Sequence, residues 1–426
     1  MSAERLTPLL VGPCPAEWRQ PYIDEITDLL TNGFVGTSLP HQTENSETGI
    51  RYLQGFNVRP NKVDLTKTTW VTHDFHAKNR KSQLREGDVL VVQSGHIGTA
   101  AVVPKEAAGS NCHAAIICRF KSEIVDPHFA SQYLNSQIGQ ARLRGLHVGS
   151  SLAHINTSEL GRFKLPLPPI HEQRMLAQLW GTWDTAMQKT EQLIAAKERH
   201  YSYELSRLIG HGQHPRGQVG FSSEEVLTGN RSGRLSVLGD ILSESRDPDT
   251  AQDTAKRLTV RLHLQGVEAR PIRGTESDGA TVYFRRRSGQ LIYGKQNIFR
   301  GAIGLIPPEL DGYCSTQDLP AFDIGLGVDP KWLYYLLSRK RFYKSLESLA
   351  AGSGSKRLHP EELFKIRITL PDLATQSAIA QYLNTLRREI DLLEQTVVTL
   401  KTQKRGLMQK LVTGKWRVRI HDEASA

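Results

Sequence analysis

Arginine and lysine side chains are the residues of this sequence with the clearest potential chemistry. The 426-residue chain carries a net charge of +10, and its pI is about 9.4. Between Ala255 and Arg300 there are ten Lys or Arg residues against three Asp or Glu residues. Because cationic side chains displace the counterions condensed on phosphate, this balance favours a polyanionic partner over a charge that serves solubility alone.

The side chains that carry this hypothesis lie in parts of the chain without an internal repeat and in loops that follow or precede the repeated elements. Arginine and lysine hydrogen-bond guanine in the major groove, and asparagine and glutamine hydrogen-bond adenine. We predict DNA contacts from Arg51, Arg59, Lys78, Arg80, Lys81, Gln93, Ser94, His96, Arg285, Arg286, Arg287, Lys295, Gln296, Arg300, Lys356 and Arg357. For each one the alternative is a solvated charge or a phosphate contact without sequence information.

Catalytic motifs are absent from the sequence. It contains no Gly-x4-Gly-Lys-Ser/Thr, no His-Glu-x-x-His and no Gly-x-Ser-x-Gly. A small acidic cluster, Asp240, Glu244 and Asp247, is better explained as a solvated helix face. Cys112 and Cys118 lack the spacing of a zinc site. We therefore expect no catalytic residue, no metal ligand and no bound cofactor, and a chain that binds and positions.

The elements that must position the candidate residues occur twice. Leu165-Pro-Leu-Pro-Pro-Ile-His-Glu-Gln173 recurs as Ile368-Thr-Leu-Pro-Asp-Leu-Ala-Thr-Gln376, an offset of 203 residues. Val125-Asp-Pro127 and Val328-Asp-Pro330 share this offset. The offset holds without a gap from about residue 88 to residue 210, whereas the first ~85 residues and residues 212–289 do not align. A duplication predicts two halves with the same fold.

Hydrophobic patterns predict strands and short helices in each half. We expect strands at 88–93, 99–103 and 114–120, and again at 290–293 and 302–306. An amphipathic stretch at 22–30 and another at 128–143 are typical of helices.

Each copy of the proline-containing motif leads into a long helix with one apolar seam. The seam residues alternate spacings of four and three, which is a coiled-coil repeat. Its apolar members are Leu176, Trp180, Trp183, Met187, Ile194, Tyr201 and Leu208 in the first copy and Ile379, Leu383, Leu386, Ile390, Leu393, Val397, Leu400, Leu407 and Leu411 in the second. The polar residues Thr190, Lys197, Glu204 and Lys404 occupy the remaining seam positions. We expect each helix to pair with the other in antiparallel orientation; the alternative is that each packs on its own domain.

These features together resemble the specificity subunit of type I restriction-modification systems. The resemblance rests on the two proline-containing entries into a long helix, on Glu86-Gly-Asp-Val-Leu90 with Ser94-Gly-His-Ile-Gly98, and on the half-chain repeat. The second half departs from the pattern, with Asp372 in place of Pro169 and Thr375 in place of Glu172. This departure implies a second recognition domain of a different subtype.

The resemblance implies an α+β fold with two similar target-recognition domains, separated by a pair of long antiparallel coiled-coil helices with pseudo-twofold symmetry. We expect domain boundaries at 1–165 for the first recognition domain, 166–211 for the central helix, 212–368 for the second recognition domain, 369–418 for the distal helix and 419–426 for a tail.

The resemblance also implies a DNA specificity subunit that is not an enzyme by itself. Each domain would read one half of a bipartite site in double-stranded DNA, while the helices set the spacer and dock the partners. The implied partners are two methylation subunits and two restriction subunits, which would carry S-adenosylmethionine, ATP and Mg. The alternative is a non-enzymatic coiled-coil scaffold with two protein-binding domains.

Composition and the absence of long apolar runs in the sequence indicate the cellular compartment of the chain. With 38% hydrophobic and 23% charged residues it is typical of a globular protein. It has no apolar run near the ~18 residues of a membrane span, and its first residues lack a signal-peptide core. We therefore expect a cytoplasmic protein of a bacterium or archaeon and no membrane partner.

Overall fold

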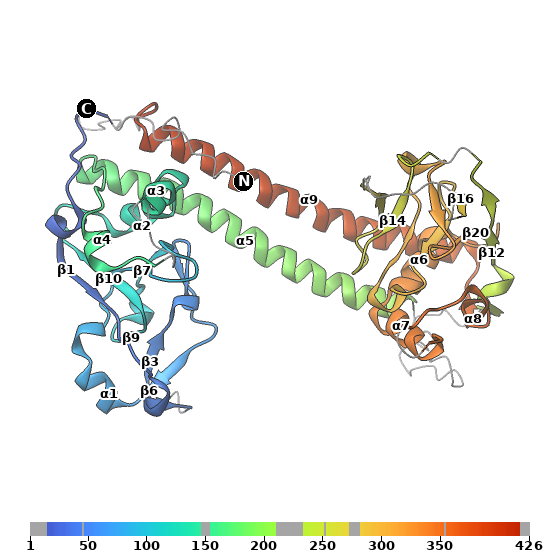
Figure 1. Cartoon of the computed structure of the whole chain (residues 1–426), viewed down its shortest axis with the longest axis horizontal. Coiled ribbons are helices and arrows are strands. Elements are labelled where there is room, and N and C mark those ends of the chain that lie inside the picture. The colour runs from blue at the N-terminus through green and yellow to red at the C-terminus, as the bar shows by residue number, and fades with distance from the viewer. Residues whose placement is uncertain are drawn as a thin grey trace. The chain divides into compact units, whose positions relative to one another are not determined.

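The computed structural model describes residues 15–44, 47–145, 154–209, 233–250, 253–271, 282–352 and 355–417. The chain divides into two compact units, one of Met1–Glu191 with Gln395–Ala426 and one of Gln192–Glu394. Two long helices, α5 (Ile170–Ile209) and α9 (Leu373–Val412), contribute residues to both units. We call the globular part that precedes α5 domain 1 and the globular part between α5 and α9 domain 2 (Figure 1).

Domain 1 is built on two four-stranded sheets. The first is antiparallel, with the order β1 (Thr27–Asn32), β10 (Ala115–Phe120), β7 (Val89–Val92) and β8 (Ala100–Val102). The second has the order β2 (Gln42–Thr43), β6 (Thr69–Val71), β3 (Ile50–Leu53) and β9 (Asn111–Cys112), with β3 and β9 parallel. The remaining elements are the hairpin β4 (Val58–Arg59) and β5 (Lys62–Val63), and helices α1 (His73–Lys78), α2 (Pro127–Asn135), α3 (Gln137–Gly145) and α4 (Thr157–Gly161).

Domain 2 repeats the main sheet of domain 1 with the same strand arrangement. The order is β12 (Leu242–Ser245), β20 (Ala321–Ile324), β17 (Leu291–Tyr293) and β18 (Ile303–Leu305). Three smaller sheets pair β13 (Asp247–Pro248), β16 (Tyr283–Arg285) and β19 (Cys314–Thr316), then β14 (Leu258–Val260) with β15 (Val267–Ala269), then β11 (Arg234–Val237) with β21 (Arg367–Leu370). Its helices are α6 (Pro330–Ser338), α7 (Lys340–Ser345) and α8 (Pro360–Phe364).

The predicted duplication is visible in the element bounds. Helices α2 and α6, α4 and α8, and α5 and α9 begin and end at positions that differ by 203 residues, and so do strands β8 and β18. The strands predicted at 88–93, 99–103 and 114–120 are β7, β8 and β10, and their counterparts in the second half are β17 and β18. The predicted α+β class with two similar domains is confirmed.

Two of the predicted helices are different in the structure. Residues 22–30 form a short 3-10 helix at Ile23–Ile26 and then strand β1, because Thr27–Asn32 pairs with β10 and supplies a sheet edge. The helix expected at 128–143 is broken at Ser136, whose hydroxyl donates to the Tyr133 carbonyl and accepts from the Gly139 amide. Tertiary pairing overrode the local helical pattern in the first case, and a side-chain cap did so in the second.

The two long helices run antiparallel where they touch within each unit. In the first unit Lys401 pairs with Glu191 at 3.1 Å and Lys404 with Asp184 at 2.6 Å, so numbers rise along α9 as they fall along α5. In the second unit Lys197 pairs with Glu389 at 2.8 Å. Each helix has 40 residues and is therefore about 60 Å long at 1.5 Å per residue. The helices begin four residues later than the predicted boundaries 166 and 369, since prolines and strand β21 precede them.

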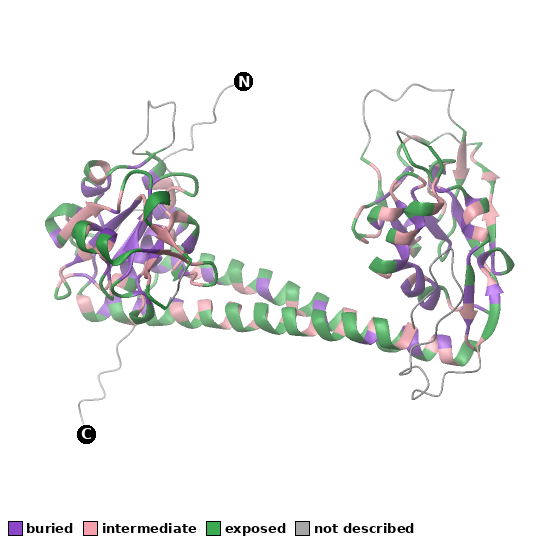
Figure 2. Ribbon diagram, turned by 90° about the horizontal axis from the view of Figure 1, so that it is seen from below, coloured by how far each residue is buried: buried purple, intermediate pink, exposed green. Residues whose placement is uncertain are grey.

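The predicted seam is the least exposed stripe of both helices. None of the sixteen predicted seam residues is exposed, whereas the outward positions of α5 and α9 are largely exposed (Figure 2). Trp180, Leu383 and Ile390 are completely buried. Polar residues share the seam: Glu204 and Lys404 are 6% and 7% exposed.

Each domain packs against the start of one long helix and the end of the other. Leu176 and Trp180 from the start of α5 join the domain 1 core, and so do Met408 and Leu411 from the end of α9. The start of α9 joins the domain 2 core through Ile379, Ala380 and Leu383, against which Tyr201, Leu205, Leu208 and Ile209 of α5 pack. The two alternatives for the helices are thus both realised, because each pairs with its partner and packs on a domain.

The repeated glutamine of the motif fastens each long helix to its domain. Gln173 accepts a hydrogen bond from the Asp126 amide at 2.9 Å and donates to the carbonyls of Ile124 and Pro168 at 3.0 and 2.9 Å. Gln376 repeats this pattern with the Asp329 amide at 2.9 Å and the carbonyls of Gly327 and Pro371 at 3.2 and 2.8 Å. Both glutamines are 1% exposed or less. They connect the first turn of α5 or α9 with the N-cap of α2 or α6, so each domain is held rigidly at the base of its helix.

Candidate nucleic-acid interface

In domain 2 the loop after β17 lies against the loop before α8. The Leu358 amide donates to the Lys295 carbonyl at 2.9 Å, and the Gln296 amide group donates to the Ser355 hydroxyl at 2.6 Å. These bonds bring together four of the predicted contact residues: Lys295, Gln296, Lys356 and Arg357. All but the half-buried Lys295 are exposed. Three of the four are cations, and two of these, Lys356 and Arg357, are exposed, so this loop pair is a cationic edge.

The corresponding loops of domain 1 also touch. The Gln93 carbonyl accepts a hydrogen bond from the Ile155 amide at 3.0 Å, and the Gln93 side chain donates to Asn32 at 2.9 Å and to the Ile155 carbonyl at 3.3 Å. Gln93 is 2% exposed and is therefore removed from the predicted DNA contacts, because its amide holds the two loops together. Ser94 and His96, which follow it, are exposed. The two domains thus present the same loop pair with different side chains.

A second basic surface in domain 1 surrounds the end of α1. Lys78 ends this helix, and Arg80 and Lys81 lie in the next turn of 3-10 helix at Arg80–Ser82. All three are exposed, and within the described parts of the chain none forms an ion pair. Helix α1 and strands β3 and β6 lie on the side of domain 1 away from α5 (Figure 1). Three cations close together in the chain and without ion-pair partners are suited to bind a phosphate backbone.

The three consecutive arginines of domain 2 divide into two exposed residues and one buried residue. Arg285, the last residue of β16, and Arg287 are exposed. Arg286 is 1% exposed and donates to the Ser315 hydroxyl at 2.7 Å and to the carbonyls of Ser245 and Leu319 at 2.6 and 3.2 Å. Burial lowers its pKa to about 10. The predicted DNA contact of Arg286 is therefore corrected to a role inside the domain.

The remaining predicted contacts differ in how free their side chains are. Arg59, in the β4–β5 hairpin, and Arg300, in the turn that follows β17, are exposed. Arg51 is half-buried: its guanidinium lies 5.4 Å from the ring centre of Trp70 and donates to the Glu106 carbonyl. Arg51 is thus partly committed to the domain, whereas the other two are accessible to a ligand.

Acidic neighbours moderate the cations of domain 2. Lys356 lies 3.0 Å from Glu347, Arg357 lies 3.6 Å from Asp318 and Arg287 lies 3.8 Å from Asp247. All six side chains are at least 44% exposed, so these pairs are weak and solvent-screened. A phosphate can compete for such cations without breaking the fold.

One buried cation of domain 2 was not identified from the sequence. Arg257 is 4% exposed, forms an ion pair with Asp249 at 3.2 Å and lies 3.5 Å from the ring centre of Tyr283. Its neighbour Lys256 is exposed, and nothing in the sequence pattern distinguishes the two. Part of the positive charge between Ala255 and Arg300 is therefore structural.

The described residues form neither a metal-ligand cluster nor a membrane-spanning helix. Among the residues that the structure describes, no three His, Cys, Asp or Glu side chains gather so that they could hold a metal ion. Within the same residues no helix is long and apolar enough to cross a membrane. Burial raises the pKa of the Cys112 and Cys118 thiols, so both are protonated at neutral pH.

Comparisons with known proteins agree with this geometry. The family model "Type I restriction modification DNA specificity domain" matches residues 37–196 and 323–402. The type I restriction enzyme MjaVIII specificity subunit of Methanocaldococcus jannaschii is 22% identical, over 80% of this chain and 82% of that protein. A structure of a type I restriction-modification S subunit from M. genitalium has a TM-score of 0.55 at 16% identity and covers 95% of this chain and 97% of its own. A chain from a structural study of the assembly and conformational transition of the type I R-M system has the same TM-score and identity.

The duplicated domains, the shared helices and the exposed cationic loops define a two-domain recognition protein. The family model covers more than half of the chain, which therefore belongs to the type I restriction-modification DNA specificity family. The resemblance stated from the sequence is confirmed. The family is one of DNA recognition rather than catalysis, in agreement with the prediction that the chain is not itself an enzyme.

Proposed function

We propose that the chain is the DNA specificity subunit of a type I restriction-modification complex, in which each domain reads one half of a bipartite target. The observation that carries this proposal is the duplication: two domains with the same sheet are each fastened by a buried glutamine to the base of a long helix. A rigid base fixes the direction in which each domain presents its loops. We keep the predicted boundaries at residues 165 and 368 for the two recognition domains.

DNA contact in this proposal comes from the exposed side chains. Lys78, Arg80 and Lys81 of domain 1 neutralise phosphates, because they lie in one turn and lack acidic partners among the described residues. The loop pairs supply the base contacts: Ser94 and His96 in domain 1, and Gln296, Lys356 and Arg357 in domain 2. Arg59, Arg285, Arg287, Lys295 and Arg300 add phosphate or base contacts, and Arg51 contributes only its exposed part.

The long helices set the length of the unread spacer. A seam with a 3.5-residue repeat tolerates whole heptads, since one heptad returns every seam residue to its face. Insertion of seven residues in each helix, after Glu191 and after Glu394, adds about 10.5 Å, which is the rise of about three base pairs. We expect a spacer lengthened by about three base pairs and two unchanged half-sites. An unchanged spacer would contradict the proposal that the length of the two helices sets the spacer.

The partners and the location follow from the same proposal. The exposed faces of α5 and α9 dock two methylation subunits, and two restriction subunits complete the nuclease. S-adenosylmethionine, ATP and Mg belong to those partners. We place the complex in the cytoplasm of a bacterium or archaeon, where its DNA target is found.

The salt dependence of DNA binding tests this function against the scaffold alternative. The full chain with its methylation subunits is titrated with duplex DNA at several salt concentrations. Each phosphate contact adds about −0.9 to the slope of log affinity against log salt, so six or more contacts give a slope of about −5 or steeper. The variant Lys78→Gln/Arg80→Gln/Lys81→Gln loses up to three contacts and flattens the slope, whereas the control Lys365→Gln, directly after α8, leaves it unchanged. A flat slope in the unmodified complex favours a scaffold.

A further inference from the structure

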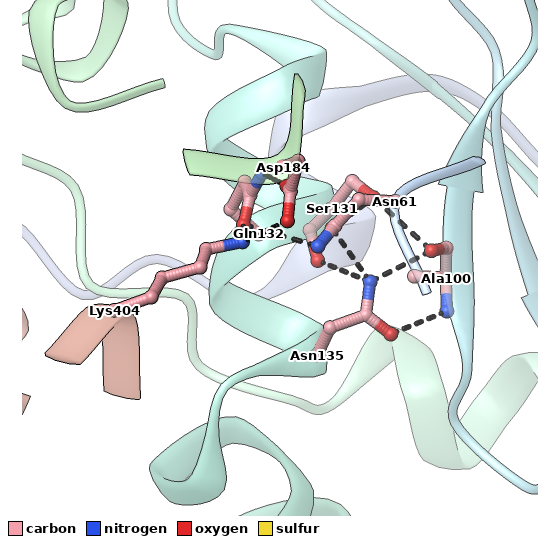
Figure 3. Close-up of polar contacts among 7 residues, drawn as sticks. All are labelled: Asn61, Ala100, Ser131, Gln132, Asn135, Asp184 and Lys404. Carbon is pink, nitrogen blue, oxygen red and sulfur yellow. Dashed lines mark hydrogen bonds and ion pairs between the residues drawn. The ribbon is translucent and has the colours of Figure 1, made fainter. Parts of the chain in front are cut away.

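At the junction of domain 1 with the helices, three elements meet around a buried ammonium group. Lys404 of α9 donates to Asp184 of α5 at 2.6 Å and to the Gln132 side-chain oxygen of α2 at 2.9 Å (Figure 3). Gln132 in turn donates to Asp184 at 2.6 Å, which closes a triangle. The Lys404 side chain is 9% exposed and that of Asp184 is 33% exposed. We call Gln132, Asp184 and Lys404 the ionic triad.

The domain holds this triad in place from behind. Asn61, at the tip of the β4–β5 hairpin, donates to the Gln132 oxygen at 3.0 Å and accepts from Ser131 at 3.1 Å and Asn135 at 2.7 Å (Figure 3). Asn61 has a φ of 60°, a left-handed conformation that asparagine adopts more readily than most residues. Asn135 also bonds both backbone groups of Ala100 in β8. The acceptors that receive Lys404 are therefore oriented before the helix docks.

At the junction of domain 2 the same three positions have other chemistry. The residues 203 positions away from Gln132, Asp184 and Lys404 are Tyr335, Arg387 and Tyr201. The rings of Tyr201 and Tyr335 meet edge to face with centres 6.5 Å apart, and the Tyr335 hydroxyl donates to Asn384 at 2.8 Å. Arg387 pairs with Asp391 of its own helix at 2.8 Å. We call these three residues the aromatic triad.

Either helix end would be a poor fit at the wrong junction. Lys404 in place of Tyr201 would put a buried ammonium beside Arg387, at a junction whose carboxylate, Asp391, is already paired with that arginine. Tyr201 in place of Lys404 would leave Asp184 and Gln132 without their cationic donor. Because the two junctions share a backbone through the duplication, shape alone cannot distinguish the two helix ends. The side-chain chemistry of the two triads can distinguish the two helix ends.

We propose that the two triads form a pairing code, by which the C-terminal half of α9 docks only on domain 1 and the C-terminal half of α5 only on domain 2. The code makes the chain close on itself with the correct helix on each domain. It also rejects a second copy of the chain that offers the other helix end. This inference does not depend on what the domains bind.

The junction of domain 1 has space for a tyrosine side chain at position 404. A cavity of about 370 Å³ adjoins the triad and is lined by Asn61, Gln132, Lys404 and Met408 among others. A ring at position 404 can enter this space. The effect of Lys404→Tyr therefore reports unsatisfied polar groups rather than crowding.

Hydrogen exchange on the full-length chain tests the code. Lys404→Tyr is a mismatch, and we expect the amides of residues 395–412 to lose protection on the order of 100-fold, while those of β7 and β10 keep theirs. The variant Gln132→Tyr/Asp184→Arg/Lys404→Tyr transfers the whole aromatic triad to domain 1, and we expect it to restore the protection. Unchanged protection in the single variant would overturn the proposal, and so would an equal loss in the single and triple variants.

A reciprocal pair at domain 2 keeps the test decisive where a domain 1 variant fails to fold. Tyr201→Lys is the mismatch there, and Tyr201→Lys/Tyr335→Gln/Arg387→Asp is the matched transfer. We expect residues 192–209 to lose protection in the single variant and to regain it in the triple variant. Loss that persists in the matched variant shows that the surroundings, and not the triad, select the helix end.

Discussion

Domain 1 and domain 2 place nearly the same backbone around different side chains. The glutamine that fastens the long helix makes three equivalent hydrogen bonds in both units. The triad that receives the other helix end is ionic in one unit and aromatic in the other. The loop pairs, with His96 in one and Arg357 in the other, also differ. The duplication thus preserved what holds the domains and changed what they contact.

The largest effect is expected where the two halves are alike. Gln173→Ala and Gln376→Ala each remove a side chain that is 1% exposed or less and the three hydrogen bonds it makes to a backbone amide and two carbonyls, which lowers the free energy of unfolding by about 3 kcal/mol. Unfolding by a chemical denaturant measures this decrease in the free energy of unfolding. The exposed residues Gln178 and Gln381 lie at equivalent positions of α5 and α9, so Gln178→Ala and Gln381→Ala are matched controls with little expected change. A loss in only one half would show that the two fastenings are not equivalent.

A similar loss is expected inside domain 2 from one arginine but not from its neighbour. Arg286→Met removes the donor from one buried and two partly buried acceptors and lowers the unfolding free energy by about 2–3 kcal/mol. Arg287→Gln changes an exposed side chain, so we expect stability within ~0.5 kcal/mol of wild type and weaker DNA binding. Thermal unfolding and a DNA titration of both variants separate the two roles. Equal stability of the two variants would contradict the structural role of Arg286.

The loop pairs are expected to act on DNA and not on stability. Lys356→Gln/Arg357→Gln removes two exposed cations from the loop pair of domain 2, and His96→Gln changes the loop after β7 in the loop pair of domain 1. Each base contact that is lost costs about 1–3 kcal/mol of discrimination at its own position. Site selection on a DNA pool should show relaxed preference in one half-site per variant. Relaxation of both half-sites by one variant would mean that the domains do not read separately.

The smallest effect concerns a cap that only the second helix has. Asp372 accepts hydrogen bonds from the amide and hydroxyl of Thr375, whereas the equivalent position in domain 1 is Pro169. These bonds lower the pKa of Asp372 from 3.8. The stabilisation is therefore fully present above the unfolded pKa and is lost as the pH falls through the folded pKa. We expect Asp372→Ala to lower the melting temperature slightly at pH 7 and less at pH 3; a constant difference would contradict the ionised cap.

The sequence was sufficient for the parts of the fold that periodicity and repetition encode. The seam, the offset of 203 residues and strands β7, β8 and β10 all follow from local patterns. Strand β1 was missed because Thr27–Asn32 has a helical pattern and becomes a strand only through its pairing with β10. Lys404 could be recognised only as an interruption of the apolar seam. Its partner Gln132 is 272 residues away, and no local pattern connects the two.

The candidate interface was less predictable than the fold for the same reason. Residue type favoured Arg285, Arg286 and Arg287 equally, but Arg286 is buried and donates to three acceptors inside domain 2. Gln93 has the chemistry of an adenine contact and instead holds two loops together. Burial is a property of the folded domain, so side-chain type alone overestimated the contact set.

Selection of bound sequences from a random pool of duplex DNA, with the full chain and its methylation subunits, tests the central claim most directly. We predict a bipartite motif in which two short half-sites of unrelated sequence are separated by a fixed number of unread base pairs. A single continuous motif, or no enrichment at moderate salt, would contradict the account of two domains that each read one half of the target.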